Sequence, residues 1–309
     1  MRLLTPARAA ATLLAVALGT WSARVSTANS QQPVQVQMRN VALHVEERIV
    51  LNVRQLRGEL IGTTPDEPPA FDDTSSFTVR IDSAEIAISV DGLSRLLNEH
   101  VFNYEGAPLE KLTVSTEGDR LKVKGTLKRG VSVPFTTVAE PRVDQDGNLR
   151  LRTQSVSALG VPAKRFLDFV GLELDKLMKL KPEHGVRVEG DDLILAPSRL
   201  VPPPRIAGRL SSVRIEPGTI VQIFGPGRAA PLHPPLAQGN YMYYRGGVLR
   251  FGKLTMDDAD LELIDRDPRD PFDFFQAKYL SQLVAGYSKT TPSQGLTVLM
   301  PDYHRLAHK

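Results

Sequence analysis

The sequence contains no cysteine and only one tryptophan among its 309 residues. Without cysteine there are no disulfide bonds, thiolate metal ligands, cysteine nucleophile or lipid anchor on an N-terminal cysteine. The Gly-x-Ser-x-Gly elbow and the Ser-x-x-Lys motif of serine hydrolases are missing too, and residues 225–227 lack the Lys-Ser/Thr sequel of a phosphate loop. We therefore expect packing alone to stabilise the chain, and we expect a protein that is not an enzyme.

Long apolar runs are equally scarce, and beyond the N-terminus no stretch approaches about 18 uninterrupted apolar residues. The apolar run at 9–21 follows two arginines and precedes small polar residues, which is the layout of a signal peptide over residues 1–30. Cleavage near Ala28 or Ser30 would make the protein periplasmic or secreted. A retained N-terminal anchor is the alternative, although a spanning helix needs about 20 residues.

An excess of charge of one sign is also absent once the predicted signal peptide is set aside. The chain has 38 basic and 35 acidic residues, and the signal contains Arg2, Arg8 and Arg24 but no acidic residue. The remaining chain therefore has 35 of each and a formal net charge of zero. Clustered lysine and arginine supply most non-specific affinity for nucleic acid, so we expect no nucleic-acid partner.

Alternation of apolar and polar residues dominates the chain from residue 34 to 225 and predicts a meander of antiparallel strands. Two helical patterns interrupt it. The first is capped by Asp91 and extends to Val101, and the second begins at Pro162. We therefore expect an α+β fold in which an antiparallel sheet packs around one or two helices.

The last third of the chain has a different texture. Residues 226–239 are rich in proline and glycine and predict a linker or an extended wrap after a first domain at 31–225. Residues 240–309 predict a smaller α+β extension with strands and one helix that begins at Pro271. The residues of that helix expected to face inward are Phe272, Phe275, Tyr279, Leu280, Leu283 and Val284.

The candidate metal ligands do not follow a known spacing. An acidic run could offer oxygens to calcium, but helix capping and solvated turns explain it as well; it comprises Asp257, Asp258, Asp260, Glu262, Asp265, Asp267, Asp270 and Asp273. The six histidines are scattered, and His304 and His308 share helical spacing only at the C-terminus. We expect no metal and no cofactor. Paired carboxylates for glycoside chemistry remain open, because their separation is spatial.

One strand is strongly basic on a single face. Arg120, Lys122, Lys124 and Lys128 alternate with apolar residues, so they share one side of the strand. A solvated outer face that discourages edge-to-edge aggregation is one explanation. Contact with anionic lipid headgroups is the other, because that attraction depends on local charge density.

The order of elements between residues 34 and 225 resembles the LmeA-like phospholipid-binding family, a bacterial branch of the tubular lipid-binding (TULIP) superfamily. The resemblance lies in the strand at 49–60 ending Leu-Arg-Gly-Glu-Leu, the segment Ile-Ala-Ile-Ser-Val-Asp-Gly-Leu-Ser-Arg-Leu-Leu-Asn at 86–98, and the strands at 112–133. The helix from Pro162 continues it. The family is shorter than this chain, and residues 226–309 have no counterpart in it.

The resemblance implies a long, strongly curved antiparallel sheet around a helix, with an apolar channel for acyl chains. The candidate channel residues are Leu93, Leu96, Leu97, Val101, Phe166, Val170, Leu174 and Leu177, which would equally fill an ordinary core. The leading hypothesis is an exported, non-catalytic protein that binds or carries a phospholipid or fatty acid, with a membrane surface as a second candidate partner. The alternative is a structural or protein-interaction module of the cell envelope, docked through the aromatic segments 241–244 and 272–275.

Overall fold

A computed structural model describes most of the chain after the N-terminus. The described residues are 32–129, 131–159, 161–162, 164–166, 168, 172, 185–226, 231–234, 236, 238–291 and 293–306. The predicted signal peptide, most of the predicted second helix and the candidates Val170, Leu174 and Leu177 lie outside them. No helix among these residues combines the length and apolar character of a membrane span.

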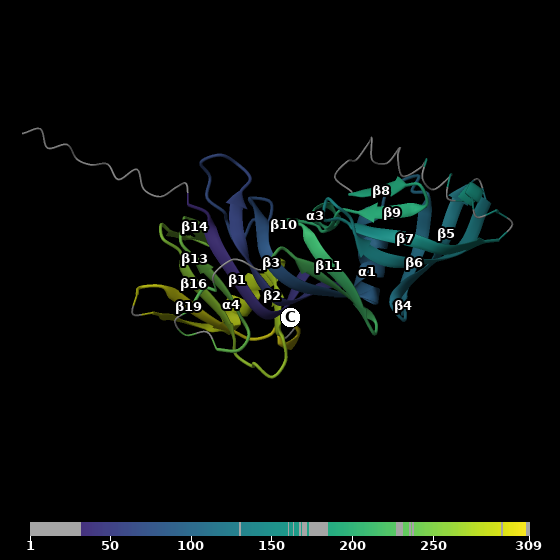
Figure 1. The fold of residues 1–309 in the computed structure, drawn as a ribbon. Coiled ribbons are helices and arrows are strands. Elements are labelled where there is room, and N and C mark those ends of the chain that lie inside the picture. The colour runs from purple at the N-terminus through teal and green to yellow at the C-terminus, as the bar shows by residue number, and fades with distance from the viewer. Residues whose placement is uncertain are drawn as a thin grey trace, which may run out of the picture.

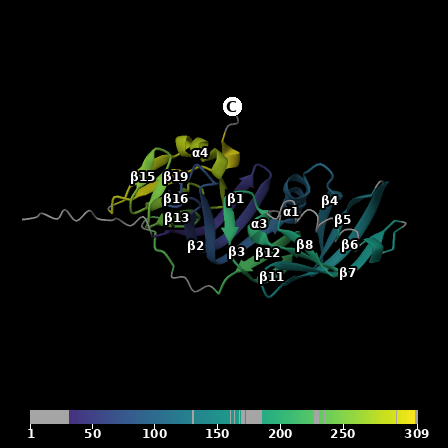
Figure 2. The same cartoon turned by 90° about the horizontal axis from the view of Figure 1, so that it is seen from above.

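Two large sheets form most of the described structure and lie toward opposite ends of an elongated molecule (Figures 1 and 2). The larger has eleven described strands: β1 (Val34–Glu46), β2 (Ile49–Gly62), β3 (Phe77–Ser89), β10 (Arg205–Ala207), β11 (Leu210–Glu216), β12 (Thr219–Phe224), β13 (Tyr241–Arg245), β16 (Asp260–Asp265), β17 (Phe272–Phe275), β18 (Tyr287–Thr290) and β19 (Leu296–Met300). The smaller has six: β4 (Leu109–Glu117), β5 (Arg120–Arg129), β6 (Val131–Val143), β7 (Leu149–Ala158), β8 (Val186–Glu189) and β9 (Asp192–Leu195).

Among the described residues, the continuous helices are few and short. They are α1 (Val90–Leu96), the π-helical turn η1 (Leu97–Val101), α3 (Pro197–Leu200), the 3₁₀ turn η3 (Gln276–Lys278), α4 (Tyr279–Ala285) and the 3₁₀ turn η4 (Tyr303–Arg305). A separate hairpin joins β14 (Leu249–Phe251) to β15 (Leu254–Met256). Large curved antiparallel sheets with a few helices confirm the predicted α+β class.

Helix α1 continues directly from the long strand β3. Its N-cap is Ser89, whose hydroxyl accepts a hydrogen bond from the backbone N–H of Gly92 at 3.0 Å. The cap is therefore two residues earlier than the predicted Asp91, which instead forms an ion pair with Arg95 one turn later. Both residue types cap helices well, so the sequence alone did not distinguish them.

The strands of residues 240–309 continue the sheet that the N-terminal strands begin. Strand β13 pairs antiparallel with the first half of β1, and β17 pairs parallel with its second half. The change of partner occurs at Asn40, whose φ of 51° lies in the left-handed region that asparagine tolerates better than most residues. We call this place the β1 fork. It joins the two ends of the chain into one sheet.

The helix predicted from Pro271 is wrong over its first turn. Residues Phe272 to Phe275 form β17, and all four side chains are buried. A strand covered on both faces loses the alternation that reveals a half-buried one, and its apolar spacing can imitate a helix. The helix α4 begins at Tyr279, and its Leu280 and Val284 are 56% and 85% exposed rather than inward-facing.

The proline-rich segment before β13 packs on the larger sheet. Gln37 on β1 exchanges two hydrogen bonds with the backbone of Leu232, and the buried carboxylate of Glu262 accepts one from the N–H of Leu236 at 3.0 Å. The described part of this segment is therefore an extended wrap, which was one of the two expected forms.

Candidate functional site

Helix α1 lies where the two sheets meet and is fastened to the edge strand β4 (Figure 1). The Ser94 hydroxyl accepts a hydrogen bond from the N–H of Val114 at 2.8 Å. The Asn98 amide both donates to the carbonyl of Leu112, at 2.7 Å, and accepts from its N–H, at 2.9 Å. These side chains satisfy backbone groups that an edge strand leaves free, and they hold the helix at a set distance from the sheet.

An apolar cavity of about 120 Å³ lies between this helix and the concave face of the smaller sheet. Fourteen of its eighteen described lining residues are apolar, including Leu93 and Leu97 on the helix and Phe135 and Ala139 on β6. The polar ones are Thr137, Thr153, Asp191 and Asp192. Asp191 is exposed, so the cavity reaches the surface beside the turn between β8 and β9.

A second apolar cavity of about 50 Å³ lies between the other face of α1 and the larger sheet. Leu93 and Leu195 line both cavities, so only these side chains and their neighbours separate them. The second cavity is bounded on the far side by Leu51 of β2 and Ile88 of β3. The two cavities together follow the helix from one sheet to the other.

The predicted channel residues divide into three groups. Leu93, Leu96, Leu97 and Phe166 line one or both of these cavities, and the ring of Phe166 lies 5.0 Å from that of Phe135. Val101 is buried but lines a neighbouring pocket, between His100 and the chain at 198–205. The remaining three, at positions 170, 174 and 177, lie outside the described residues.

Most of the wall comes from strand residues that sequence reasoning did not select. The alternation in β4 to β7 identified them as one face of a sheet, for example Val114, Leu121 and Leu151. Sequence cannot say whether such a face closes completely on its neighbours, because a void depends on how side chains from distant segments interlock.

The basic strand β5 is paired with acidic residues of β4. Lys122 lies 2.8 Å from Glu117 and Lys128 lies 2.7 Å from Glu110, while Arg120 is 3.9 Å from Asp119. Hydrogen bonds from the two lysines lower the pKa of both glutamates, which keeps them charged. Lys124 has no ion-pair partner among the described residues. Headgroup contact by this strand stays a prediction, and the acids reduce its local positive charge.

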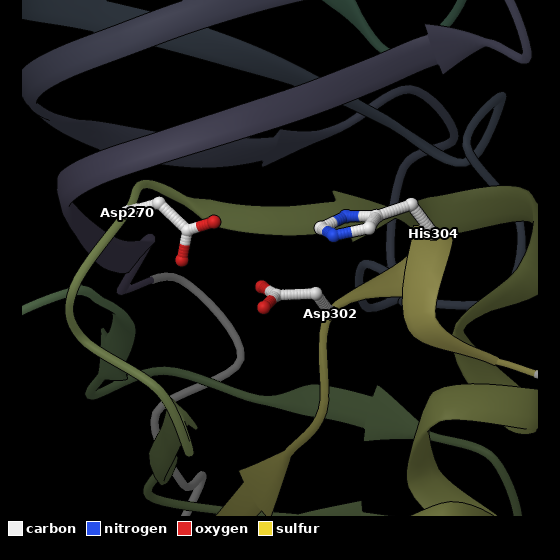
Figure 3. Close-up of side chains that lie close together, drawn as sticks. All are labelled: Asp270, Asp302 and His304. Carbon is white, nitrogen blue, oxygen red and sulfur yellow. The ribbon is translucent and has the colours of Figure 1, made fainter.

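A second cluster of functional side chains lies beside the β1 fork. Figure 3 shows the side chains of Asp270, Asp302 and His304 pointing toward one another. Each offers one ligand-type atom, and these atoms all lie within 4.8 Å of one another. They come from the loop before β17 and from the segment after β19.

Asp273 on β17 connects this cluster to β1. Its Oδ1 lies 2.6 Å from Nε2 of His44, and its Oδ2 lies 2.6 Å from Nδ1 of His304. Burial alone would raise the pKa of Asp273, but these hydrogen bonds outweigh it and the pKa is lowered. The carboxylate is therefore ionised and accepts a hydrogen bond from an N–H group of each ring.

The two rings face different numbers of acceptors. His44 also directs Nδ1 at the carbonyl of Glu47, at 3.0 Å, so both of its nitrogens face acceptors. Burial opposes its charge, but Asp273 outweighs that effect and the pKa of His44 is raised. His304 directs Nδ1 at Asp273, so its Nε2 faces away from that carboxylate.

Two other carboxyl groups of the cluster have raised pKa values, so they ionise less readily than a free aspartate. Burial, with the neighbouring charge of Asp270, raises the pKa of Asp302. Burial, with the charges of Asp302 and Asp270, raises the pKa of Asp265. Such raised values mark carboxylates that lack sufficient compensating positive charge.

The aromatic segments proposed for docking a partner are buried. Tyr241, Tyr243 and Tyr244 on β13 and all three phenylalanines of β17 are less than 9% exposed. Two of them, Tyr244 and Phe274, pack against Phe71, which also contacts Phe251 and Tyr279. The centroids of these four rings lie between 5.1 and 6.0 Å from that of Phe71. They form a core and present no aromatic surface to a partner.

Comparison with known proteins adds no further assignment. No family model, curated protein or solved structure matches this chain. The resemblance to the LmeA-like family stays a prediction, and the function must be inferred from the site itself.

Proposed function

We propose that this protein binds the acyl chain of a phospholipid or fatty acid in the apolar space beside α1 and acts as a non-catalytic lipid-binding or lipid-carrying protein. The observation that carries the proposal is the larger cavity, fourteen of whose eighteen described lining residues are aliphatic or aromatic and whose polar lining includes the exposed Asp191. Transfer of a hydrocarbon chain from water into such a space lowers the free energy, while the headgroup stays in water.

The size of the cavity limits what it accepts without rearrangement. At about 120 Å³ it is smaller than the roughly 300–1,000 Å³ of most ligand pockets and close to the engineered apolar cavity of about 150 Å³ that binds benzene. It therefore holds a short length of hydrocarbon, and a full acyl chain must also part Leu93 and Leu195 to reach the second cavity.

The position of the wall residues favours an opening along the helix rather than between the strands. Helix α1 is held to β4 by side-chain hydrogen bonds, and β4 to β7 form a continuous ladder. The side chains of Leu93 and Leu195 are held only by packing, so they move at lower cost than a backbone hydrogen bond breaks.

A space-filling variant tests the proposal. Ala139 is 5% exposed and lines the larger cavity, so Ala139→Leu places extra carbon atoms in it. The matched control is Thr136→Leu, on the opposite face of the same strand. Native mass spectrometry after incubation with palmitate should detect a 1:1 complex with the unmodified protein and the control. Ala139→Leu should weaken it by about tenfold, or about 1.4 kcal/mol.

Two results would contradict the proposal. One is a protein that binds neither palmitate nor a dipalmitoyl phospholipid. The other is palmitate binding that Ala139→Leu and Thr136→Leu leave equally unchanged, because the acyl chain would then occupy another place. The expected export of the chain forms part of this proposal, and the lipid would then be one encountered outside the cytoplasm.

A further inference from the structure

The cluster at the β1 fork contains more negative than positive groups. Its five carboxylates belong to Asp265, Asp267, Asp270, Asp273 and Asp302. The arginines paired with them among the described residues are Arg269 and Arg305, and the rings of His44 and His304 are both hydrogen-bonded to Asp273.

Two oxygens of the cluster are buried without a hydrogen bond. Asp302 is only 1% exposed, and its Oδ2 has no hydrogen-bond donor among the described residues. Nε of Arg305 is the nearest cation, at 3.4 Å, and the same guanidinium lies 3.6 Å from Oδ2 of Asp270. Oδ1 of Asp270 is likewise unpartnered. Buried polar oxygens are costly to leave without hydrogen bonds, so two of them in one place indicate a missing partner.

The third potential ligand is oriented by a carboxylate behind it. Asp273 accepts one hydrogen bond from Nδ1 of His304, at 2.6 Å, and a second from the backbone N–H of His304, at 3.0 Å. The ring is therefore held with Nε2 as its free acceptor. A carboxylate that holds a histidine in this way is the usual support of a metal-binding imidazole, since it sets the tautomer and increases basicity.

We propose that Asp270, Asp302 and His304 bind a divalent first-row transition ion, for which Zn²⁺ is the best-matched probe. The donor set is one imidazole nitrogen and two carboxylate oxygens, whereas Ca²⁺ and Mg²⁺ prefer oxygen ligands alone. Three protein ligands leave at least one coordination position for water or another ligand. The ion would join the loop before β17 to the segment after β19, and so fasten the fork.

The observed separations require a small contraction. Zn²⁺ bonds of about 2.0–2.1 Å bring tetrahedral ligand atoms to about 3.4 Å from one another, against a limit of 4.8 Å here. Asp270 can supply the movement, because its side chain is 46% exposed and lies in the loop between β16 and β17. Asp302 and His304 are held by their contacts with β17.

The test is a Zn²⁺ titration of the full chain after chelation, with affinity measured by competition against a chromogenic chelator. One equivalent should bind, and an excess of Ca²⁺ should not displace it. Asp302→Asn and His304→Gln should each weaken binding by at least about tenfold, and Asp273→Asn by about 10- to 100-fold through loss of the supporting hydrogen bond. The control is Asp258→Asn, an exposed acid that lies 3.5 Å from Arg245 and outside this cluster.

Two further measurements keep the result interpretable. The His304 side chain is 57% exposed, so His304→Gln should retain the thermal unfolding profile of the chelated protein. Substituted Co²⁺ should give visible absorption bands that this variant loses. Absence of binding at one equivalent, binding that survives His304→Gln unchanged, or displacement by Ca²⁺ would each overturn the proposal, since the ion would then be absent, held elsewhere or held by oxygens alone.

Discussion

Two regions of this molecule differ in what their side chains leave unsatisfied. Beside α1 most of the side chains that line the two cavities are aliphatic or aromatic, and their packing leaves unfilled apolar space. Beside the β1 fork the core is dense and aromatic, and carboxylates with incomplete partners lie at its rim. One region therefore contains unfilled apolar space, and the other contains buried carboxylate oxygens without hydrogen bonds. The proposed acyl chain would fill the first, and the proposed cation would bind the second.

The largest expected effect separates dense from loose packing. Phe71 is 1% exposed within the aromatic core, so Phe71→Ala should lower the free energy of unfolding by about 3–5 kcal/mol. Leu97→Ala, at the edge of an existing cavity, should cost about 2–3 kcal/mol because fewer contacts are lost. Urea unfolding of both variants measures the difference. Equal costs would mean that the two regions are packed alike.

The next effect tests how firmly α1 is held. Asn98 makes two hydrogen bonds to the backbone of Leu112 and a third to the carbonyl of Ser94. Asn98→Ala leaves partly buried backbone groups unpaired and should destabilise by about 2–3 kcal/mol. Hydrogen exchange should also become faster at the N–H of Leu112. Unchanged exchange there would show that packing, rather than these bonds, positions the helix.

A pH-dependent effect tests the charge of His44 in the region beside the β1 fork. The raised pKa of His44 means that its ion pair with Asp273 stabilises fully below the unfolded value of about 6.5 and is lost as pH rises through the folded value. His44→Gln should therefore lower the free energy of unfolding by about 2 kcal/mol at pH 5.5 and by much less at pH 9. Denaturant unfolding at both pH values, with a chelator present, checks it. A pH-independent cost would contradict the assigned charge.

The smallest effect concerns the basic strand. Lys122 pairs with Glu117 at the surface, where the gain from attraction is offset by lost side-chain freedom and screening. Lys122→Gln should leave the melting temperature unchanged within error. Binding to vesicles that contain phosphatidylglycerol is the second measurement. Weakened binding with unchanged melting would support the predicted headgroup contact, and unchanged binding would leave the strand as a solvated face.

Several features of the fold could be read from residue patterns. Alternation located the long strands β1, β2 and β3, and the apolar spacing of Leu93, Leu96 and Leu97 located the helix that follows them. These signals are local, because a half-buried strand or helix repeats its exposure every two or about 3.6 residues. They also identified four described residues that line the apolar cavities.

The charged cluster could not be found in this way. His304 and Asp302 follow the last strand, Asp270 lies more than 30 residues earlier, and His44 is on the first long strand. Their spacing matches no metal motif, and the acidic run appeared to be capping residues and turns. The β1 fork brings them together, because β17 pairs with the second half of β1 beside the end of β19.

The sequence by itself determined that the long segments β1, β2 and β3 are strands, that a helix follows them and that no thiol chemistry takes part. Each of these follows from side-chain type and local periodicity. Only the tertiary structure decided that the apolar faces leave a void, that Phe272 to Phe275 form a doubly covered strand, and that Asp270, Asp302 and His304 converge. Voids, two-sided burial and convergence depend on contacts between distant segments, which no local pattern records.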